Sequence, residues 1–123
     1  MHSQSAHGLK RLANATWYSL KGIQAAWRSE AAFRQEVILA VVLLPSAVWL
    51  GTTMVQRAIL ILSVMSVLVV ELLNSAIEAT VDRIGPERHL LSGQAKNMGS
   101  AAVLLSLICM VVVWILVAWQ RWG

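Results

Sequence analysis

The sequence predicts an all-α membrane protein, with one amphipathic surface helix followed by three transmembrane helices. Two observations support this fold class. Of the 123 residues, 58% are hydrophobic and only 13% are charged, whereas about a quarter of the residues in an ordinary soluble domain are charged. Three apolar stretches also approach the roughly 20 residues that a helix needs to cross the hydrocarbon core of a bilayer. The length favours a single domain over residues 1–123.

The N-terminal region is polar at first and then amphipathic. We expect residues 1–7 to form a disordered tail. Residues 8–28 are expected to form a helix, because apolar side chains recur there at helical offsets while most cations fall on the other side. Such a helix suits the membrane interface. The same pattern also fits a soluble helix packed on a partner, which is the alternative.

The three apolar stretches predict transmembrane helices over residues 31–50, 58–81 and 99–119. Pro45 lies within the first of them, where a transmembrane helix tolerates proline with a kink. The segments between the helices are short. Small residues open the third helix, and they would let it pack closely on a neighbour.

The basic residues predict the orientation of the chain. Of the ten Lys and Arg residues, only Arg57 and Arg121 lie on the side of the bilayer opposite the N-terminus. This asymmetry places the N-terminus and the segment 83–98 in the cytoplasm and the C-terminus outside. Tryptophans would form an outer belt, as they often do at membrane interfaces; this belt comprises Trp49, Trp114, Trp119 and Trp122.

The second transmembrane segment carries an unexpected polar stripe: Glu71, Asn74, Ser75, Glu78 and Asp82. Their spacing puts these residues on one side of a helix. Glu78 would lie roughly 10 Å along the axis from Glu71 and near the cytoplasmic mouth, with Glu71 deeper. An ionisable residue inside a membrane usually marks a functional site. The alternative is a set of interhelical hydrogen bonds that only hold helices together.

Further charged residues face the same mouth. Glu30 and Glu78 could together hold Mg²⁺ and a phosphate, although Glu30 could instead pair with Arg34 four residues later. The segment before the third helix adds Glu87, Arg88, His89 and Lys96, and a lone histidine such as His89 is more often a surface residue than a ligand. Because three helices of one chain are not expected to enclose the polar stripe, we expect a homo-oligomer.

Three motifs resemble the integral-membrane diacylglycerol kinases of bacteria, in their proteobacterial form: EAAFRQE, VELLNSAIEAxVDRIG (where x is any residue) and LSGQAKNMGSAAV. The similarity runs from Leu9 to the C-terminus. It implies a homotrimer in the bacterial inner membrane that uses Mg²⁺ and ATP to phosphorylate diacylglycerol, giving phosphatidic acid. The implied partners are the lipid substrate, MgATP and membrane lipids, and no nucleic acid.

The resemblance also implies roles for individual residues. Glu71 resembles the general base, with Asn74 beside it, and Glu30 and Glu78 resemble the Mg²⁺ ligands. The residues that resemble the ATP-binding set are Arg11, Tyr18, Glu30, Glu78, Glu87, Arg88, His89, Lys96 and Asn97. Those that resemble the lipid-binding set are Ala32, Glu36, Trp49, Arg57, Glu71, Ser100 and Trp114. One departure is Asn97, since the family pattern has Asp after the lysine.

Three rival functions stay open from the sequence. A related enzyme could phosphorylate undecaprenol instead of diacylglycerol. An intramembrane glutamate also occurs in small proton-coupled transporters. A subunit that only packs helices is the third possibility.

Overall fold

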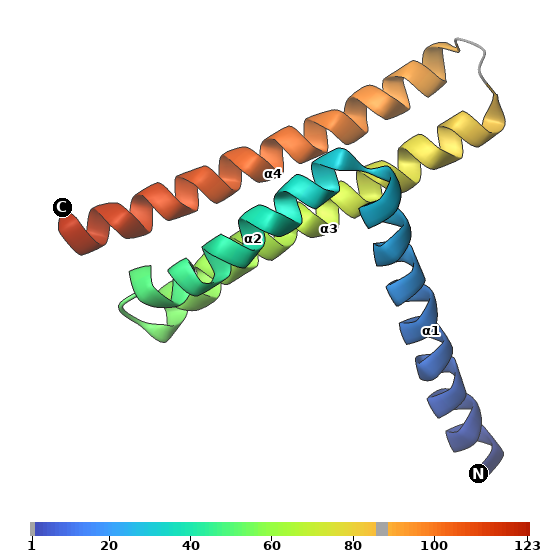
Figure 1. The fold of residues 1–123 in the computed structure, drawn as a ribbon, viewed down its shortest axis with the longest axis horizontal. Helices are drawn as coiled ribbons and strands as arrows, with labels where there is room; N and C mark the ends of the chain where they lie inside the picture. The colour runs from blue at the N-terminus through green and yellow to red at the C-terminus, as the bar shows by residue number, and fades with distance from the viewer. Residues whose placement is uncertain (1, 86–88) are drawn as a thin grey trace.

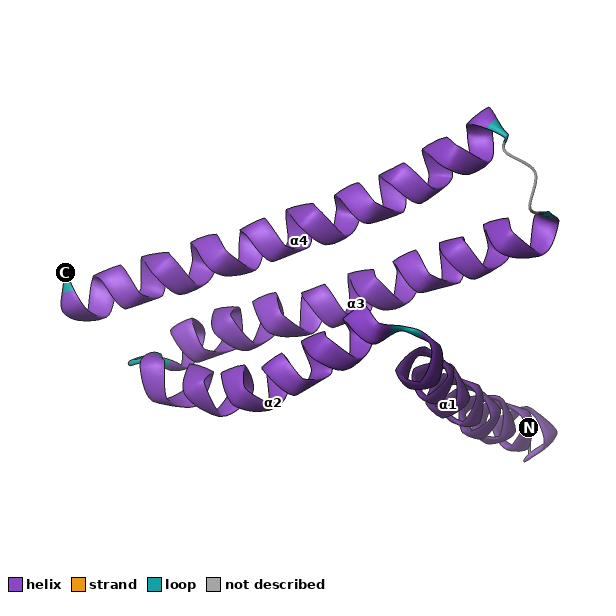
Figure 2. Cartoon of the chain, turned by 45° about the horizontal axis from the view of Figure 1, so that its top comes forward, coloured by secondary structure: helices purple, strands orange, loops and turns teal. Residues whose placement is uncertain are grey.

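The computed structural model describes residues 2–85 and 89–123, with the side chains from residue 6 onward. These residues form four helices: α1 (His2–Ser29), α2 (Ala31–Leu50), α3 (Met54–Ile84) and α4 (Leu90–Trp122). Helices α3 and α4 run antiparallel along each other, and α2 packs along part of α3 (Figure 1). Helix α1 leaves this bundle at a steep angle, as Figure 2 also shows.

Three of these helices, α2, α3 and α4, are long and apolar enough to cross a membrane. This confirms the prediction of three transmembrane helices preceded by an N-terminal helix. Helix α2 has the predicted bounds and continues through Pro45, but α3 and α4 extend into the polar flanks beyond residues 58–81 and 99–119. Backbone hydrogen bonding continues wherever residues favour a helix, so its ends need not follow the edges of the apolar stretch.

The structure begins α1 at His2 rather than near residue 8. Residues 2–7, predicted to be part of a disordered tail, therefore lie in the first turns of this helix. Neither proline nor a β-branched run interrupts residues 2–15, so the polar composition itself does not prevent helix formation.

The core lies along one seam of α3. Leu60, Val64 and Val67 are buried, and their spacing of four and three residues places them on the same helical face. Val64 and Val67 pack with Ala40 of α2 and Met110 of α4. Helix α3 is therefore the central element, covered by α2 on one side and by α4 on the other.

One end of the bundle, here called the tryptophan end, is fastened by two arginines. Arg121 Nη1 donates to the carbonyl oxygens of Trp49 and Leu50 at 2.8 and 3.0 Å, and its guanidinium lies over the rings of Trp49 and Trp122. Arg57 Nε donates to Val48 O at 2.9 Å. Because the last carbonyls of a helix have no partner within it, these arginines cap α2.

The other end of the bundle carries Glu30, Glu78 and Asp82 and is here called the carboxylate end. It also contains the junction between α1 and α2. Arg34 Nη1 donates to the carbonyl oxygens of Trp27 and Arg28, at 2.7 and 3.1 Å. The guanidinium thereby caps the last turn of α1 and fixes how α2 begins. No ion pair joins Arg34 to Glu30 in the described part of the chain, so Arg34 does not neutralise that carboxylate.

Candidate functional site

The buried seam of α3 changes from apolar to polar as it approaches the carboxylate end. After Val67 it continues with Glu71 and Asn74, which are only 4% and 8% exposed. Glu78 follows at the same spacing and is half-buried, and its Oε1 accepts a hydrogen bond from Asn74 Nδ2 at 3.3 Å. The helical period that builds the core thus also carries these three polar residues inward.

One chain encloses the deep half of this stripe by itself. The expectation that three helices of one subunit could not do so was wrong for Glu71 and Asn74. The reason is a close approach of α4, because a Cβ atom added at Gly99 would collide with Asn74 Oδ1. The absence of a side chain at Gly99 therefore lets α4 cover Asn74, as expected for small residues that open a membrane helix.

Two buried polar atoms of the seam have no hydrogen-bond partner among the described residues: Asn74 Oδ1 and Ser75 Oγ. Buried polar groups are nearly always paired. Ser75 and Glu30 both line a cleft of about 460 Å³ between α1 and α3. Its other walls are mostly small residues, including Gly22, Ala26 and Ala76. The cleft therefore offers room for a ligand beside the stripe.

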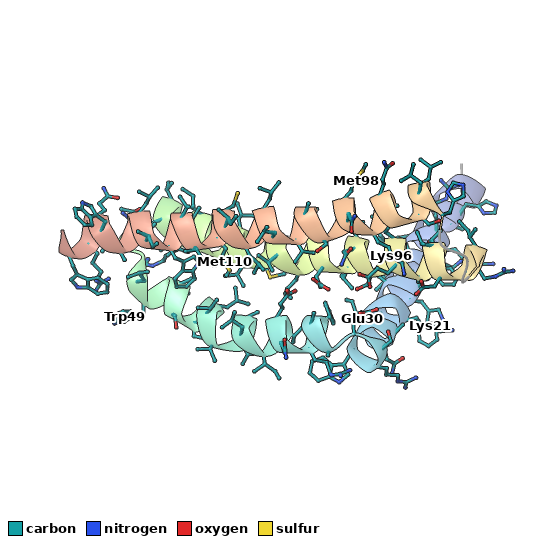
Figure 3. The ribbon with its side chains drawn as sticks, turned by 90° about the horizontal axis from the view of Figure 1, so that it is seen from above. Lys21, Glu30, Trp49, Lys96, Met98 and Met110 are labelled. Carbon is teal, nitrogen blue, oxygen red and sulfur yellow. The ribbon has the colours of Figure 1, made fainter. Side chains whose placement is uncertain are left out.

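Glu30 and Glu78 lie within electrostatic range of Glu71. Glu30 stands in the bend between α1 and α2, at the carboxylate end (Figure 3). Glu36 approaches Glu71 from α2, and its buried Oε2 has no hydrogen-bond partner in the described chain. Four carboxylates from two helices and a bend thus converge on one region, where their repulsion would be relieved by a cation or by protons.

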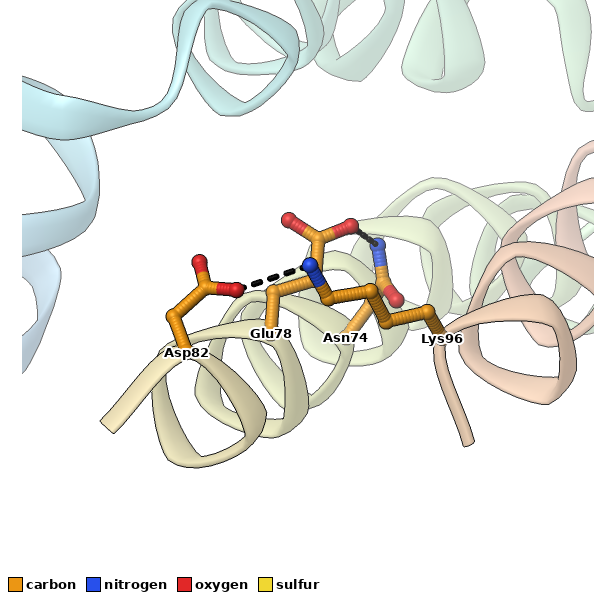
Figure 4. Close-up of polar contacts among 4 residues, drawn as sticks. All are labelled: Asn74, Glu78, Asp82 and Lys96. Carbon is orange, nitrogen blue, oxygen red and sulfur yellow. Dashed lines mark hydrogen bonds and ion pairs between the residues drawn. The ribbon is translucent and has the colours of Figure 1, made fainter. Parts of the chain in front are cut away.

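Lys96 of α4 supplies a cation at the carboxylate end. Its Nζ lies 2.7 Å from Asp82 Oδ1, and this is the only ion pair among the described residues. Figure 4 shows Lys96 reaching across from α4 to the stripe, beside the hydrogen bond between Asn74 and Glu78. The helical spacing predicts that Asp82 lies on the stripe, but the pairing with Lys96 was not predicted. The feature that pointed to Asp82 is its position four residues, or about one helical turn, after Glu78.

The other predicted nucleotide-binding residues do not converge on the stripe within one chain. Arg11, Tyr18 and Asn97 are exposed. His89 Nδ1 accepts a hydrogen bond from Leu91 N at 3.1 Å, so this histidine caps the start of α4. The predictions for Glu87 and Arg88 fall outside the described residues.

The predicted lipid contacts are spread along the bundle. Ala32 and Ser100 are exposed near the carboxylate end, whereas Trp49 and Arg57 lie at the tryptophan end. At 1.5 Å per residue, Arg57 lies about 21 Å from Glu71 along α3. Trp114 lies between them, half-buried, and its Nε1 donates to Ser63 Oγ at 3.1 Å. These residues do not form a single pocket in one chain.

Comparison with known proteins decides the family. A model of the family described as prokaryotic diacylglycerol kinase matches residues 17–118. This chain belongs to the prokaryotic diacylglycerol kinase family. The resemblance seen in the three motifs is thereby confirmed.

Individual relatives agree with this membership of the diacylglycerol kinase family. The Escherichia coli K12 protein named diacylglycerol kinase is 55% identical, over 94% of this chain and 95% of its own length. The Pseudomonas aeruginosa protein of the same name is 57% identical over 87% of each chain. That of Haemophilus influenzae is 50% identical over 87% of this chain and 91% of its own.

Proposed function

We propose that this protein transfers the γ-phosphate of ATP to the hydroxyl of diacylglycerol, giving phosphatidic acid and ADP. The observation that supports this reaction, in a chain of this family, is that the polar stripe becomes less buried from Glu71 to Glu78. Glu71 is buried, while Glu78 is half-buried and lies about two helical turns nearer the carboxylate end. A lipid hydroxyl reaches the stripe from the bilayer, and a nucleotide reaches it from water.

Glu71 is the proposed general base. It would accept the proton of the lipid hydroxyl as the hydroxyl oxygen forms a bond to the γ-phosphorus and the bond to the leaving ADP oxygen breaks. Its enclosure keeps water from competing with the lipid as the acceptor. Asn74, one turn away, would hold Glu78 through the 3.3 Å hydrogen bond and so orient the next carboxylate.

Glu30 and Glu78 are the proposed Mg²⁺ ligands, and their chemistry fits that ion. Oxygen ligands suit Mg²⁺, which is usually held by one or two carboxylates together with substrate phosphates and water. The described residues contain no group of three or more His, Cys, Asp or Glu side chains able to hold a metal alone. The metal would neutralise charge on the transferring phosphoryl group.

The nucleotide would lie at the carboxylate end, with Lys96 directed at its phosphates. Arg11, Tyr18, His89 and Asn97 complete the proposed contacts, together with Glu87 and Arg88 from the adjoining segment. The lipid headgroup would lie beside Glu71, with Ala32, Glu36 and Ser100 around it. Trp49, Arg57 and Trp114 would accompany the acyl chains toward the tryptophan end, which suits a substrate with long chains.

We further propose a homotrimer in the bacterial inner membrane, with the N-terminus cytoplasmic and the C-terminus periplasmic. Two of the ten Lys and Arg residues, Arg57 and Arg121, are at the tryptophan end or beside it, which matches an outer end. Much of the apolar surface of α4 is exposed in a single chain, including Leu104, Leu105, Ile108 and Leu116. Other copies and lipid would cover it.

The test of the reaction is a phosphorylation assay on the purified protein in mixed micelles, with diacylglycerol and undecaprenol as separate acceptors. We expect phosphatidic acid and ADP to form in equal amounts. Glu71→Gln should abolish lipid phosphorylation while an ATP analogue still binds with Mg²⁺. Faster turnover on undecaprenol would refute the proposal that diacylglycerol is the substrate. A fully active Glu71→Gln variant would refute the proposal that Glu71 is the general base.

A further inference from the structure

Asp82 is the one carboxylate of the chain without a part in the proposed reaction. It lies on α3 one turn beyond Glu78, and its Oδ1 is 2.7 Å from Lys96 Nζ on α4. The two residues are 14 apart in sequence, so their contact joins the end of one long helix to the start of the next. Figure 4 shows Lys96 reaching from α4 to Asp82 on α3.

Lys96 lies near two carboxylates, so its contact with Asp82 also determines which of them it pairs with. Glu78 also lies close enough for its charge to act on Lys96. A lysine has four rotatable bonds and a compact charge that can pair with either carboxylate. Were Lys96 to bind Glu78, it would occupy an oxygen that the proposed function assigns to the metal. The hydrogen bond to Asp82 holds the ammonium one turn further out.

The exposure of the pair suits a contact that can be exchanged. The Lys96 and Asp82 side chains are 44% and 67% exposed. Ion pairs with this much exposure to water contribute little to stability, so the ammonium can move to a phosphate at low cost. A charged group held ready near its target also loses less conformational entropy when the target binds.

We propose that Asp82 is a positioning residue that holds Lys96 away from Glu78 and ready for the phosphates of the incoming nucleotide. This inference rests on the proposed function, because it concerns the same site. Asp82 itself would touch neither the lipid nor the phosphoryl group.

The test compares Asp82→Asn, Asp82→Glu and the unchanged protein as full chains in mixed micelles. We expect Asp82→Asn to raise the KM for MgATP by up to about tenfold, the upper cost of ordering one long side chain on binding, while the KM for diacylglycerol stays unchanged. Calorimetry should show a matching loss of affinity for a non-hydrolysable ATP analogue. Asp82→Glu keeps the charge and should recover most of this affinity. Thr80→Ala, which removes a hydroxyl bonded to its own helix at Ala76 O, is the matched control.

A second comparison separates positioning from stability. In a Lys96→Met background, Asp82→Asn should change ATP-analogue affinity less than twofold, because a residue that acts through Lys96 has no effect without it. Three results would overturn the inference: unchanged affinity in Asp82→Asn, equal losses in both backgrounds, or a loss that Asp82→Glu does not recover. If the unchanged protein does not phosphorylate diacylglycerol, the proposed function fails; if it does and the Asp82 variants match it, only this inference fails.

Discussion

The contact between Gly99 and Asn74 gives the sharpest prediction from the structure. In Gly99→Ala the new Cβ would collide with Asn74 Oδ1 and lie 3.3 and 3.8 Å from Asn74 Cγ and Cβ. The whole Asn74 side chain therefore stands against it, and either this side chain turns or α4 moves away. Both responses disturb the hydrogen bond from Asn74 to Glu78.

The expected magnitudes differ for stability and activity. Overpacking costs about 1–3 kcal/mol, and replacing glycine by alanine within a helix regains about 1 kcal/mol. The net destabilisation is therefore at most about 2 kcal/mol. A hydrogen bond to a charged group contributes about 1.5–3 kcal/mol. At 3.3 Å the bond is long for its class, so we take the lower figure and expect about a tenfold loss of turnover.

Thermal unfolding in micelles and the lipid kinase assay measure these two effects. Gly93→Ala is the matched control for stability, because it adds the same methyl group to the same helix with nothing within 4 Å. It should unfold no more readily than the unchanged protein. If Gly99→Ala unfolds like Gly93→Ala and keeps full turnover, α4 does not press on Asn74 and the proposed enclosure of the stripe is incorrect.

Three further predictions concern contacts away from the stripe. Trp114→Phe removes the indole donor to Ser63 and should lower the free energy of unfolding by about 1 kcal/mol; the same change should cost much less in a Ser63→Ala background, and an equal cost there would contradict the bond. Arg34→Gln removes the cap on α1, so amides of residues 20–29 should exchange hydrogen faster while those of α4 do not; unchanged exchange at α1 would contradict the cap. Asn97→Asp introduces, at an exposed position, the residue that the family resemblance leads us to expect there, and it should not reduce kinase activity; a large loss would contradict that expectation.

Several features of the fold could be predicted because they depend only on neighbours along the chain. The apolar stretches predict three membrane helices, since hydropathy sums over consecutive residues. The stripe from Glu71 to Asp82 could be placed on one helical face from the 3.6-residue period. The helix ends were less predictable, as α4 begins at Leu90 and not at residue 99.

The pairing of helices could not be predicted in this way. Arg34 was a candidate partner for Glu30 and instead caps α1, because a long side chain chooses among acceptors that only the bend between α1 and α2 brings near. Similarly, His89 was considered as a surface residue or a ligand, and it caps α4.

The sequence alone determined that this chain enters a membrane, that α3 carries carboxylates on one face, and which family its motifs resemble. Those properties depend only on the order of residues along the chain and on the 3.6-residue period of the helix. Only the tertiary structure decided that one chain encloses Glu71 and Asn74, that Gly99 is the point of closest approach, and that Lys96 pairs with Asp82. These contacts depend on how two helices are rotated and placed against each other, and that geometry results from packing between residues distant in the chain.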